Sequence, residues 1–278
     1  MNRLRLERLV RLALEEDLGS GDMTSELVVA PGLRARAEIV AKQDFLVLAG
    51  SEAASLAFRL VDAQVEQEWL RADGDVLSRG QAACRLEGPA RSLLSAERVA
   101  LNFLQRLSGV ATLTRRFVEA AAPHRARITD TRKTTPGLRM LEKAAVRSGG
   151  GANHRFGLYD AVLIKDNHLA AAGGLAEALR AARAGASHLM KIQVEVTSLA
   201  QVEEALRAGA DAILLDNMAA PEMAEAVRLV AGRVPLEASG GVSLANVAEV
   251  AATGVDYISV GALTHSAPAV DLSLEFLP

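Results

Sequence analysis

The sequence predicts an α/β protein in which an irregular α+β region precedes a short or incomplete parallel α/β barrel. Its 278 residues, 50% of them hydrophobic, suit about two domains at roughly 150 residues each. Residues 1–94 mix a helical stretch with several strands, whereas from Arg127 onward short apolar runs alternate with helical segments. This alternation is typical of a parallel sheet, and a repeated strand–helix unit suggests a barrel.

The elements of the first region follow from local periodicity and turns. Apolar residues recur at helical spacing between Leu4 and Leu18, and the stretch 19–22 (Gly-Ser-Gly-Asp) ends that helix. Strands are expected over residues 35–48, 65–70 and 76–86. Turn signals such as Asp73-Gly74 separate these strands. One long helix is expected over 95–122.

The second region shows six strand-like runs, at residues 126–131, 161–165, 192–196, 212–216, 236–239 and 257–261. Helices are expected over 137–147, 175–184, 198–208, 221–231 and 244–252. Ser198 with Gln201 fits a capping box, and Gly185, Gly209 and Gly254 suit C′ positions. A full eight-unit barrel takes about 250 residues, and this region is much shorter, so the barrel is expected to be incomplete.

Composition excludes several classes of protein. The net charge of −3 and the 3% of aromatic residues give no support for a nucleic-acid partner. The single cysteine, Cys84, cannot form an internal disulfide or a multi-cysteine metal site, and we expect it to be a small core residue in a protein of the reducing cytoplasm. Charges interrupt the apolar runs well before the roughly 20 residues of a membrane helix, so no membrane association is expected.

Positive charge gathers between residues 130 and 165, where seven Lys and Arg face three acids, a local balance of +4. A solvated helix face explains Arg139, Glu142, Lys143 and Arg147. By contrast, Arg132, Lys133, Arg155 and Lys165 lie beside apolar strands and glycine-rich turns. We expect these four side chains to bind a small polyanion, such as a phosphate ester or a dicarboxylate.

Other polar groups stand where predicted barrel strands end. Glu195 and Asp216 could bind Mg²⁺ or sugar hydroxyls, or act as a general acid/base pair, and these readings stay open. The glycine-containing strings 239–241 and 260–262 could present backbone N–H groups to a phosphate. His154 ends a string with three glycines, which is either a flexible connector or a ligand loop, and His154 alone could be a core histidine.

Eight strings, in their order along the chain, resemble those of the quinolinate phosphoribosyltransferase family, also called nicotinate-nucleotide pyrophosphorylase (carboxylating). They occupy residues 97–102, 130–139, 149–155, 163–168, 194–196, 215–217, 237–241 and 260–265. The most specific are Asp-Thr-Arg-Lys-Thr from Asp130 and Lys-Asp-Asn-His from Lys165. The resemblance implies an α/β sandwich over 1–105 and a barrel of six or seven strands over 106–266, with the tail 267–278 able to pack back on the sandwich.

The resemblance also implies a reaction and roles for the site residues. Quinolinate and phosphoribosyl pyrophosphate would react with Mg²⁺ present to give nicotinate mononucleotide, pyrophosphate and CO₂ for NAD synthesis. The implied quinolinate-binding residues are Arg98, Arg132, Lys133, His154, Arg155 and Lys165. The implied catalytic residues are Lys133, Lys165, Glu195 and Asp216. The phosphoribosyl group would meet Glu195, Asp216, Ser239, Gly240, Gly241, Val260, Gly261 and Ala262.

The same resemblance implies that Glu195 and Asp216 hold Mg²⁺, directly or through water. It also implies a homodimer in which Arg98 reaches into the active site of the neighbouring subunit. Two positions depart from the family pattern: Gln193 stands where many relatives have an acid, and Ala152 is smaller than usual. Neither is expected to touch the central group of site residues.

Three alternatives compete with this interpretation. A paralogue of the same fold, associated with molybdenum transport, shares many motifs, and the complete cationic set argues against it. Another phosphate-binding barrel enzyme, such as an isomerase or a synthase, would not need both the 149–155 and 165–168 strings. A non-catalytic binding protein would bind no phosphoribosyl ligand.

Overall fold

The computed structural model describes residues 2–278, which form two compact units. The first unit comprises residues 2–115, Thr135–Gly150 and Ser266–Pro278, and the second comprises Arg116–Thr134 and Gly151–His265. The long predicted helix is present as α4 (Ala90–Ala121), and the division between the units falls within it. The expected domain boundary at residue 105 also lies inside this helix.

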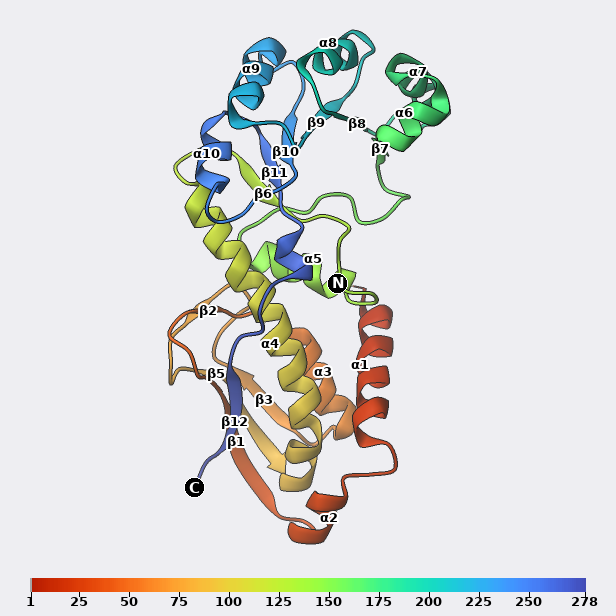
Figure 1. The fold of residues 1–278 in the computed structure, drawn as a ribbon. Helices are drawn as coiled ribbons and strands as arrows, with labels where there is room; N and C mark the ends of the chain where they lie inside the picture. Colours follow the sequence, from red (N-terminus) through yellow and green to blue (C-terminus); the bar gives the residue numbers. More distant parts are fainter. Residues whose placement is uncertain (1) are drawn as a thin grey trace. The chain divides into compact units, whose positions relative to one another are not determined.

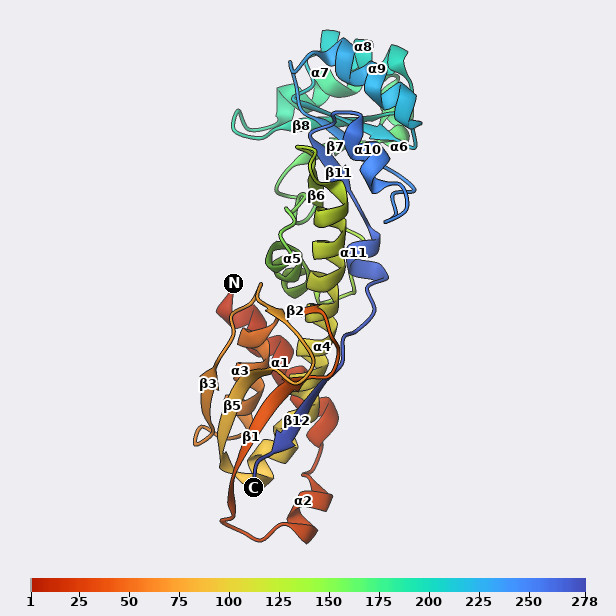
Figure 2. The same ribbon diagram turned by 90° about the vertical axis from the view of Figure 1, so that its left-hand side faces the viewer.

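The first unit contains a four-stranded antiparallel sheet in the order β12, β1, β5, β3. These strands are β12 (Leu272–Phe276), β1 (Arg34–Ala41), β5 (Ala82–Pro89) and β3 (Glu66–Trp69). Helices α1 (Arg3–Leu18), α3 (Ser51–Val61) and α4 cover one face of the sheet (Figures 1 and 2). A separate pair joins β2 (Leu46–Val47) to β4 (Val76–Leu77), so the strands expected over 35–48 and 76–86 are each broken in two.

Helix α1 begins and ends where its sequence predicts. The side chain of Asn2 accepts a hydrogen bond from the Arg5 N–H at 3.1 Å, and Gly19, with φ 49°, closes the helix. Leu6, Val10 and Leu14 form its buried stripe. Two helices of the first unit, α2 (Met23–Val28) and α3, were not predicted, although α3 buries alanines at helical spacing. Cys84 is fully buried in β5, as expected.

Helix α5 (Arg139–Ser148) belongs to the first unit and corrects one prediction. The sequence suggests a solvated face, but Glu142 and Lys143 are buried, at 0% and 1% exposure. Glu142 accepts hydrogen bonds from Arg106 Nη2 at 2.9 Å and from the Thr135 N–H at 3.0 Å and hydroxyl at 2.7 Å. A buried carboxylate is stable only with such partners, which a local charge count does not reveal.

The second unit is a six-stranded, all-parallel sheet in the order β6, β11, β10, β9, β8, β7. Its strands are β6 (Arg127–Thr129), β7 (Val162–Ile164), β8 (Ile192–Val196), β9 (Ala212–Asp216), β10 (Leu236–Ser239) and β11 (Tyr257–Ser259). Over residues 2–278 the edge strands β6 and β7 do not pair, and Ala152 makes a single parallel bridge to Thr129. The prediction of an incomplete α/β barrel is confirmed.

Helices connect successive strands and pack against the sheet (Figure 1). They are α6 (Asp166–Ala172), α7 (Leu175–Gly185), α8 (Leu199–Arg207), α9 (Ala220–Val230) and α10 (Val247–Ala252). A further short helix, α11 (Ala262–His265), follows the last strand, β11. Gly209 and Gly254 follow α8 and α10 with φ 80° and 93°, as C′ glycines do. The same prediction is wrong for Gly185, because this residue is the last of α7. Within residues 2–278, no helix has both the length and the apolar character needed to cross a membrane.

The predicted capping box at the start of α8 is half correct. Ser198 Oγ accepts a hydrogen bond from the Gln201 N–H at 3.4 Å, as a capping residue does. The Gln201 side chain, however, accepts from the Thr197 N–H at 2.8 Å instead of from Ser198. In a capping box the Gln201 side chain would accept from the Ser198 N–H, and here the donor is the preceding residue, Thr197.

Candidate active site

A cavity of about 620 Å³ opens at the carboxyl ends of the parallel strands in the second unit. Side chains from the ends of parallel strands meet at one edge of a sheet, which is where barrel proteins carry their sites. Ten of the predicted site residues line this cavity: Arg132, Lys133, His154, Arg155, Lys165, Glu195, Asp216, Ser239, Gly240 and Gly241. The structure therefore brings most of the predicted set together.

The loop that carries Arg132 and Lys133 is held by hydrogen bonds to its backbone. Thr131 Oγ1 accepts from the Lys133 N–H at 3.0 Å, and Thr264 Oγ1 donates to the Lys133 carbonyl at 2.6 Å. Arg155 donates through Nη1 to the Ala161 carbonyl at 3.1 Å. Burial, together with the neighbouring Arg132 guanidinium, lowers the pKa of Arg155. Like charges crowded in this way favour an anionic ligand.

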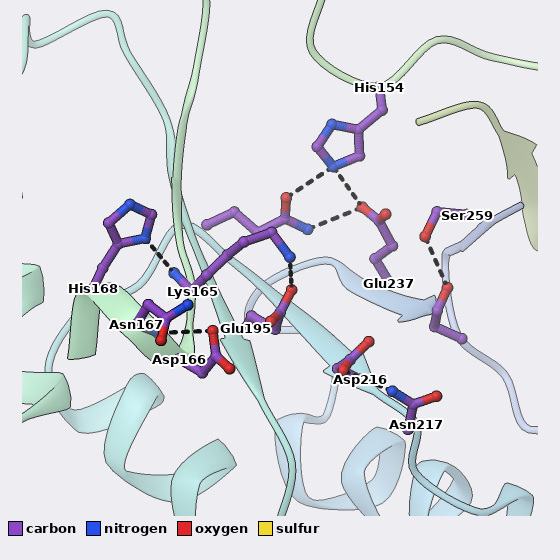
Figure 3. Close-up of polar contacts among 12 residues, drawn as sticks. His154, Lys165, Asp166, Asn167, His168, Glu195, Asp216, Asn217, Glu237 and Ser259 are labelled. Atoms are coloured by element: carbon purple, nitrogen blue, oxygen red, sulfur yellow. Dashed lines mark hydrogen bonds and ion pairs between the residues drawn. The ribbon is translucent and has the colours of Figure 1, made fainter. Parts of the chain in front are cut away.

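Lys165 and Glu195 lie at the ends of the neighbouring strands β7 and β8 and form an ion pair in the cavity (Figure 3). The Glu195 side chain is 10% exposed, so the lysine supplies a counter-ion to a carboxylate that is largely removed from water. His168 of the Lys-Asp-Asn-His string has a structural role, because its Nδ1 accepts a hydrogen bond from the Lys165 N–H at 2.9 Å at the start of α6. This bond orients the turn from which Lys165 extends.

Asp216 and the glycine loop after β10 meet at Asn217. Asn217 Nδ2 donates to Asp216 Oδ2 at 2.8 Å, and the Asn217 N–H donates to the Ser239 carbonyl at 2.9 Å. Gly240 has φ 91°, and a Cβ at that residue would lie 2.1 Å from Asn217 Oδ1. The loop therefore requires glycine at this position both for its backbone conformation and for space.

His154 is fixed by a buried network that the sequence analysis did not predict (Figure 3). Its N–H donates to Oδ1 of the fully buried Asp130 at 2.9 Å. Its Nε2 lies 3.2 Å from Gln193 Oε1 and 3.4 Å from Glu237 Oε2. Gln193 Nε2 donates to Glu237 Oε2 at 2.9 Å. The expectation that Gln193 stays outside the group of site residues is therefore wrong.

Glu237 lines the cavity and is 6% exposed. Burial raises the pKa of Glu237, but hydrogen bonds from His154 and Gln193 outweigh burial and hold the pKa below its ordinary value. The alternation of a strand could have identified this residue, since Glu237 and Ser239 lie two apart in β10 and share a face. Asn217, which the string 215–217 includes without a role, and Ser259 also line the cavity.

Four predicted residues do not line this cavity. Arg98 lies on α4 in the first unit, where its side chain is 58% exposed and 4.0 Å from Glu97. Val260, Gly261 and Ala262 are also outside the lining set, and Val260 is only 1% exposed. Gly261 nevertheless leaves room for Lys133, because an added Cβ would lie 3.1 Å from Lys133 Cδ.

Two carboxylates in the cavity, Glu195 and Asp216, are candidate ligands for a metal ion. Within residues 2–278, no group of three or more His, Cys, Asp and Glu side chains is arranged to hold a metal ion. Glu195 and Asp216 both line the cavity. Mg²⁺ is usually held by one or two carboxylates together with water and substrate phosphates, so this pair fits that mode of binding and does not fit an all-protein metal cage.

Comparisons with known proteins agree along the whole chain. Models of the N-terminal and C-terminal domains of quinolinate phosphoribosyl transferase match residues 22–108 and 110–275. A probable nicotinate-nucleotide pyrophosphorylase [carboxylating] of Bacillus subtilis is 46% identical over 99% of this chain and 94% of its own length. A quinolinate phosphoribosyltransferase [decarboxylating] of Nicotiana tabacum is 43% identical over 97% of this chain and 82% of its own.

Solved structures give the same result. The nicotinate-nucleotide pyrophosphorylase of Francisella tularensis superimposes with a TM-score of 0.95 at 39% identity, covering 100% of this chain and 98% of that one. NadC from Streptococcus pyogenes superimposes with a TM-score of 0.95 at 42% identity, covering 100% and 99% of the two chains. The chain therefore belongs to the quinolinate phosphoribosyltransferase family and is a pentosyltransferase enzyme.

Proposed function

We propose that the protein transfers the phosphoribosyl group of phosphoribosyl pyrophosphate to quinolinate, with loss of CO₂, to give nicotinate mononucleotide and pyrophosphate for NAD synthesis. The observation that carries this proposal is the meeting of four cationic side chains and three carboxylates in one cavity at the carboxyl ends of the strands. The names of the relatives in Bacillus subtilis and Nicotiana tabacum support it. The complete cationic set is also the feature that argues against the paralogue associated with molybdenum transport.

The cations provide the binding site for the quinolinate dianion. Arg132 and Arg155 can each present paired N–H donors to a carboxylate, and Lys133 and Lys165 add point charges. Each charge-assisted hydrogen bond contributes about 1.5–3 kcal/mol, so a few suffice to remove a dicarboxylate from water.

Other groups that line the cavity suit the phosphoribosyl group. Glu195 and Asp216 can accept hydrogen bonds from ribose hydroxyls, and the backbone of 239–241 can donate to the 5′-phosphate. As the bond to pyrophosphate breaks, positive charge develops at the ribose C1, and these two carboxylates stabilise it. Lys133 and Lys165 stabilise the negative charge that develops on the leaving group.

Glu195 and Asp216 are also the residues that would hold Mg²⁺. When bound, this ion neutralises charge on the pyrophosphate. Glu195 is paired with Lys165 in this structure. Binding of the substrates and the ion therefore requires this ion pair to break, so that Glu195 can contact the ion or the ribose and Lys165 can contact a substrate.

The chain needs no covalent nucleophile for this reaction. The quinolinate ring nitrogen attacks C1, and the pyridinium that forms accepts the electron pair released when the adjacent carboxylate leaves as CO₂. A proton then replaces that carboxylate on the ring carbon. The one cysteine is unsuited to attack, because burial raises the pKa of Cys84 to about 12.

We also propose a homodimer in which Arg98 completes the site of the partner subunit. The exposure of the Arg98 side chain on α4 is compatible with a contact to another subunit. Arg98 would then add a fifth cationic side chain for the dianion.

The test is an assay of purified protein with Mg²⁺, phosphoribosyl pyrophosphate and carboxyl-labelled quinolinate. We expect CO₂ and nicotinate mononucleotide in equal amounts, and loss of turnover when Mg²⁺ is chelated. Turnover of nicotinate without turnover of quinolinate would overturn the decarboxylating assignment. Turnover unchanged by chelation would overturn the role of the metal.

A further inference from the structure

Two threonine hydroxyls hold both backbone groups of Lys133. Thr131 Oγ1 accepts a hydrogen bond from the Lys133 N–H at 3.0 Å, and Thr264 Oγ1 donates to the Lys133 carbonyl at 2.6 Å. A hydroxyl has one proton to donate, and the alternative acceptor for Thr264, the Gly261 carbonyl, is farther away at 3.2 Å. The Thr264 proton is therefore directed at Lys133.

The two threonines come from neighbouring strand ends. Thr131 follows β6, and Thr264 lies in α11, which follows β11. These strands pair in parallel, and the Val260 N–H donates to the Thr129 carbonyl at 2.9 Å just before the two segments separate. Thr264 is fully buried, whereas Lys133 is exposed in the cavity. The buried hydroxyl is thus a fixed point that holds the exposed segment.

The segment after β11 also limits the side chain of Lys133. Gly261 carries no side chain, and a Cβ at this residue would lie 3.1 Å from Lys133 Cδ and 3.2 Å from His265 Nε2. Gly261 lacks the positive φ of Gly240 and Gly241, so these contacts, and not its backbone conformation, oppose an alanine there. The same short segment therefore fixes the backbone of Lys133 and borders its aliphatic stem.

Lys133 depends on this support more than Lys165 does. The Lys165 ammonium pairs with Glu195, whereas within residues 2–278 the Lys133 ammonium forms no ion pair or hydrogen bond. The place of the Lys133 charge in the cavity consequently follows from its backbone and from the space left for its stem. A displacement of about 1 Å at a reacting site can lower a rate ~100-fold, so this support matters for chemistry.

We propose that Thr264 and Gly261 are positioning residues that place the Lys133 ammonium against the pyrophosphate group of the substrate. The inference rests on the proposed function, which assigns Lys133 to the leaving group. Thr264 acts through the Lys133 carbonyl, and Gly261 acts through the room that it leaves for the lysine stem. This role is separate from any contact between the 260–262 backbone and a phosphate.

The first experiment compares two substitutions of Thr264. Thr264→Val keeps a similar shape and removes the hydroxyl, whereas Thr264→Ser keeps the hydroxyl. The readout is the dissociation constant of inorganic pyrophosphate, measured by calorimetry in the presence of Mg²⁺. We expect it to rise about tenfold in Thr264→Val and to stay within about threefold of wild type in Thr264→Ser. Equal effects of the two substitutions, or an unchanged affinity in folded Thr264→Val, would overturn the inference.

The second experiment repeats Thr264→Val in a Lys133→Ala background. We expect Lys133→Ala to weaken pyrophosphate binding by itself, and Thr264→Val to have no further effect once the lysine is absent. The same fold-change in both backgrounds would show that Thr264 acts independently of Lys133 and would refute the inference. An affinity that Lys133→Ala leaves unchanged would refute it too, because there would then be no contact to position.

Thr112→Val is the matched control for the loss of a buried hydroxyl. Thr112 Oγ1 accepts from the Val47 N–H at 2.8 Å in the first unit. Like Thr264→Val, this variant should lower the free energy of unfolding in urea titration, because a buried backbone group loses its partner. We expect its pyrophosphate affinity to equal that of wild type. A loss of affinity as large as that of Thr264→Val would show that reduced stability alone explains the effect.

Gly261→Ala keeps the inference testable if Thr264→Val does not fold. This variant removes no hydrogen bond and crowds the Lys133 stem directly. Gly185→Ala is its control, because an added Cβ at Gly185 meets nothing within 4 Å and the residue likewise has no positive φ. We expect weaker pyrophosphate binding in Gly261→Ala but not in Gly185→Ala, and no additional loss in the Lys133→Ala background. Equal losses with and without the lysine would contradict the proposal.

Failure of this inference can be distinguished from failure of the proposed function. The pyrophosphate affinities require neither quinolinate nor turnover, so an inactive wild-type protein would refute the proposed function while the binding comparison still decides the role of Thr264. With active enzyme, kcat should fall about tenfold in Thr264→Val and recover in Thr264→Ser. A kcat in Thr264→Val equal to that of wild type would overturn the positioning role.

Discussion

Alanine substitutions in the glycine loop after β10 can distinguish two causes of lost stability, backbone strain and steric overlap. Gly240 and Gly241 are adjacent, and both have positive φ, at 91° and 62°. An added Cβ at Gly241 meets nothing within 4 Å, whereas at Gly240 it would lie 2.1 Å from Asn217 Oδ1 and 3.0 Å from Asn217 N. Gly241→Ala is therefore the matched control for Gly240→Ala.

The magnitudes follow from these contacts. An L-residue in the left-handed region costs about 1–2 kcal/mol, and both alanine variants carry this cost. Gly240→Ala must in addition displace Asn217, and overpacking of this kind costs a further ~1–3 kcal/mol. Because Asn217 contacts both Asp216 and the Ser239 carbonyl, the displacement also disturbs the surface proposed for the phosphoribosyl group.

The free energy of unfolding from urea titration and the dissociation constant of phosphoribosyl pyrophosphate give the two readouts. We expect Gly240→Ala to be less stable than Gly241→Ala by about 1–3 kcal/mol and to bind this ligand about tenfold more weakly than wild type. Asn217→Gly removes the overlapping amide, so it should restore part of the stability in the double variant. Equal losses of stability in the two alanine variants would refute the steric argument.

Three further predictions concern buried charge and assembly. Glu142→Gln leaves Arg106 without its carboxylate partner and should lower the free energy of unfolding by about 3 kcal/mol in urea titration, and a loss below about 1 kcal/mol would contradict the importance of this ion pair. The folded pKa of Glu237 is lowered, so the stability it contributes is present above its ordinary pKa of 4.5 and is lost as pH falls through the lowered value. The free energy of unfolding of Glu237→Gln should accordingly fall less steeply than that of wild type between about pH 5 and pH 2, and parallel curves would count against the shift. Mixing Arg98→Ala with Lys165→Ala subunits should recover part of the quinolinate activity if the site is shared, and no recovery would indicate that both residues act within one subunit.

The sequence predicted the second unit well because its signals are local. Each parallel strand is a short apolar run, and glycines such as Gly209 and Gly254 end the preceding helices at positions that local chemistry dictates. The polar residues at the strand ends came together because parallel strands place their carboxyl ends at one edge. Most of the residues that line the cavity could therefore be predicted from the sequence.

The predictions failed where a residue's role depends on distant partners. Lys143 and Glu142 look like a solvated helix face, but burial in the first unit gives them a different environment. Gln193 and Glu237 are 44 residues apart, and only the parallel arrangement of β8, β9 and β10 brings their side chains together. Local periodicity can assign such residues to a face of a strand, but it cannot identify what they contact across the sheet.

The pairing of β12 with β1 constrains how the chain can fold during synthesis. Residues 272–276 complete the sheet of the first unit next to a strand that begins at Arg34, so the two partners are separated by most of the chain. Until residues 272–276 have left the ribosome, one edge of β1 has no strand beside it and is open to pairing with other chains. Deletion of residues 272–276 would therefore expose this edge and favour aggregation of a unit whose remaining sequence is intact.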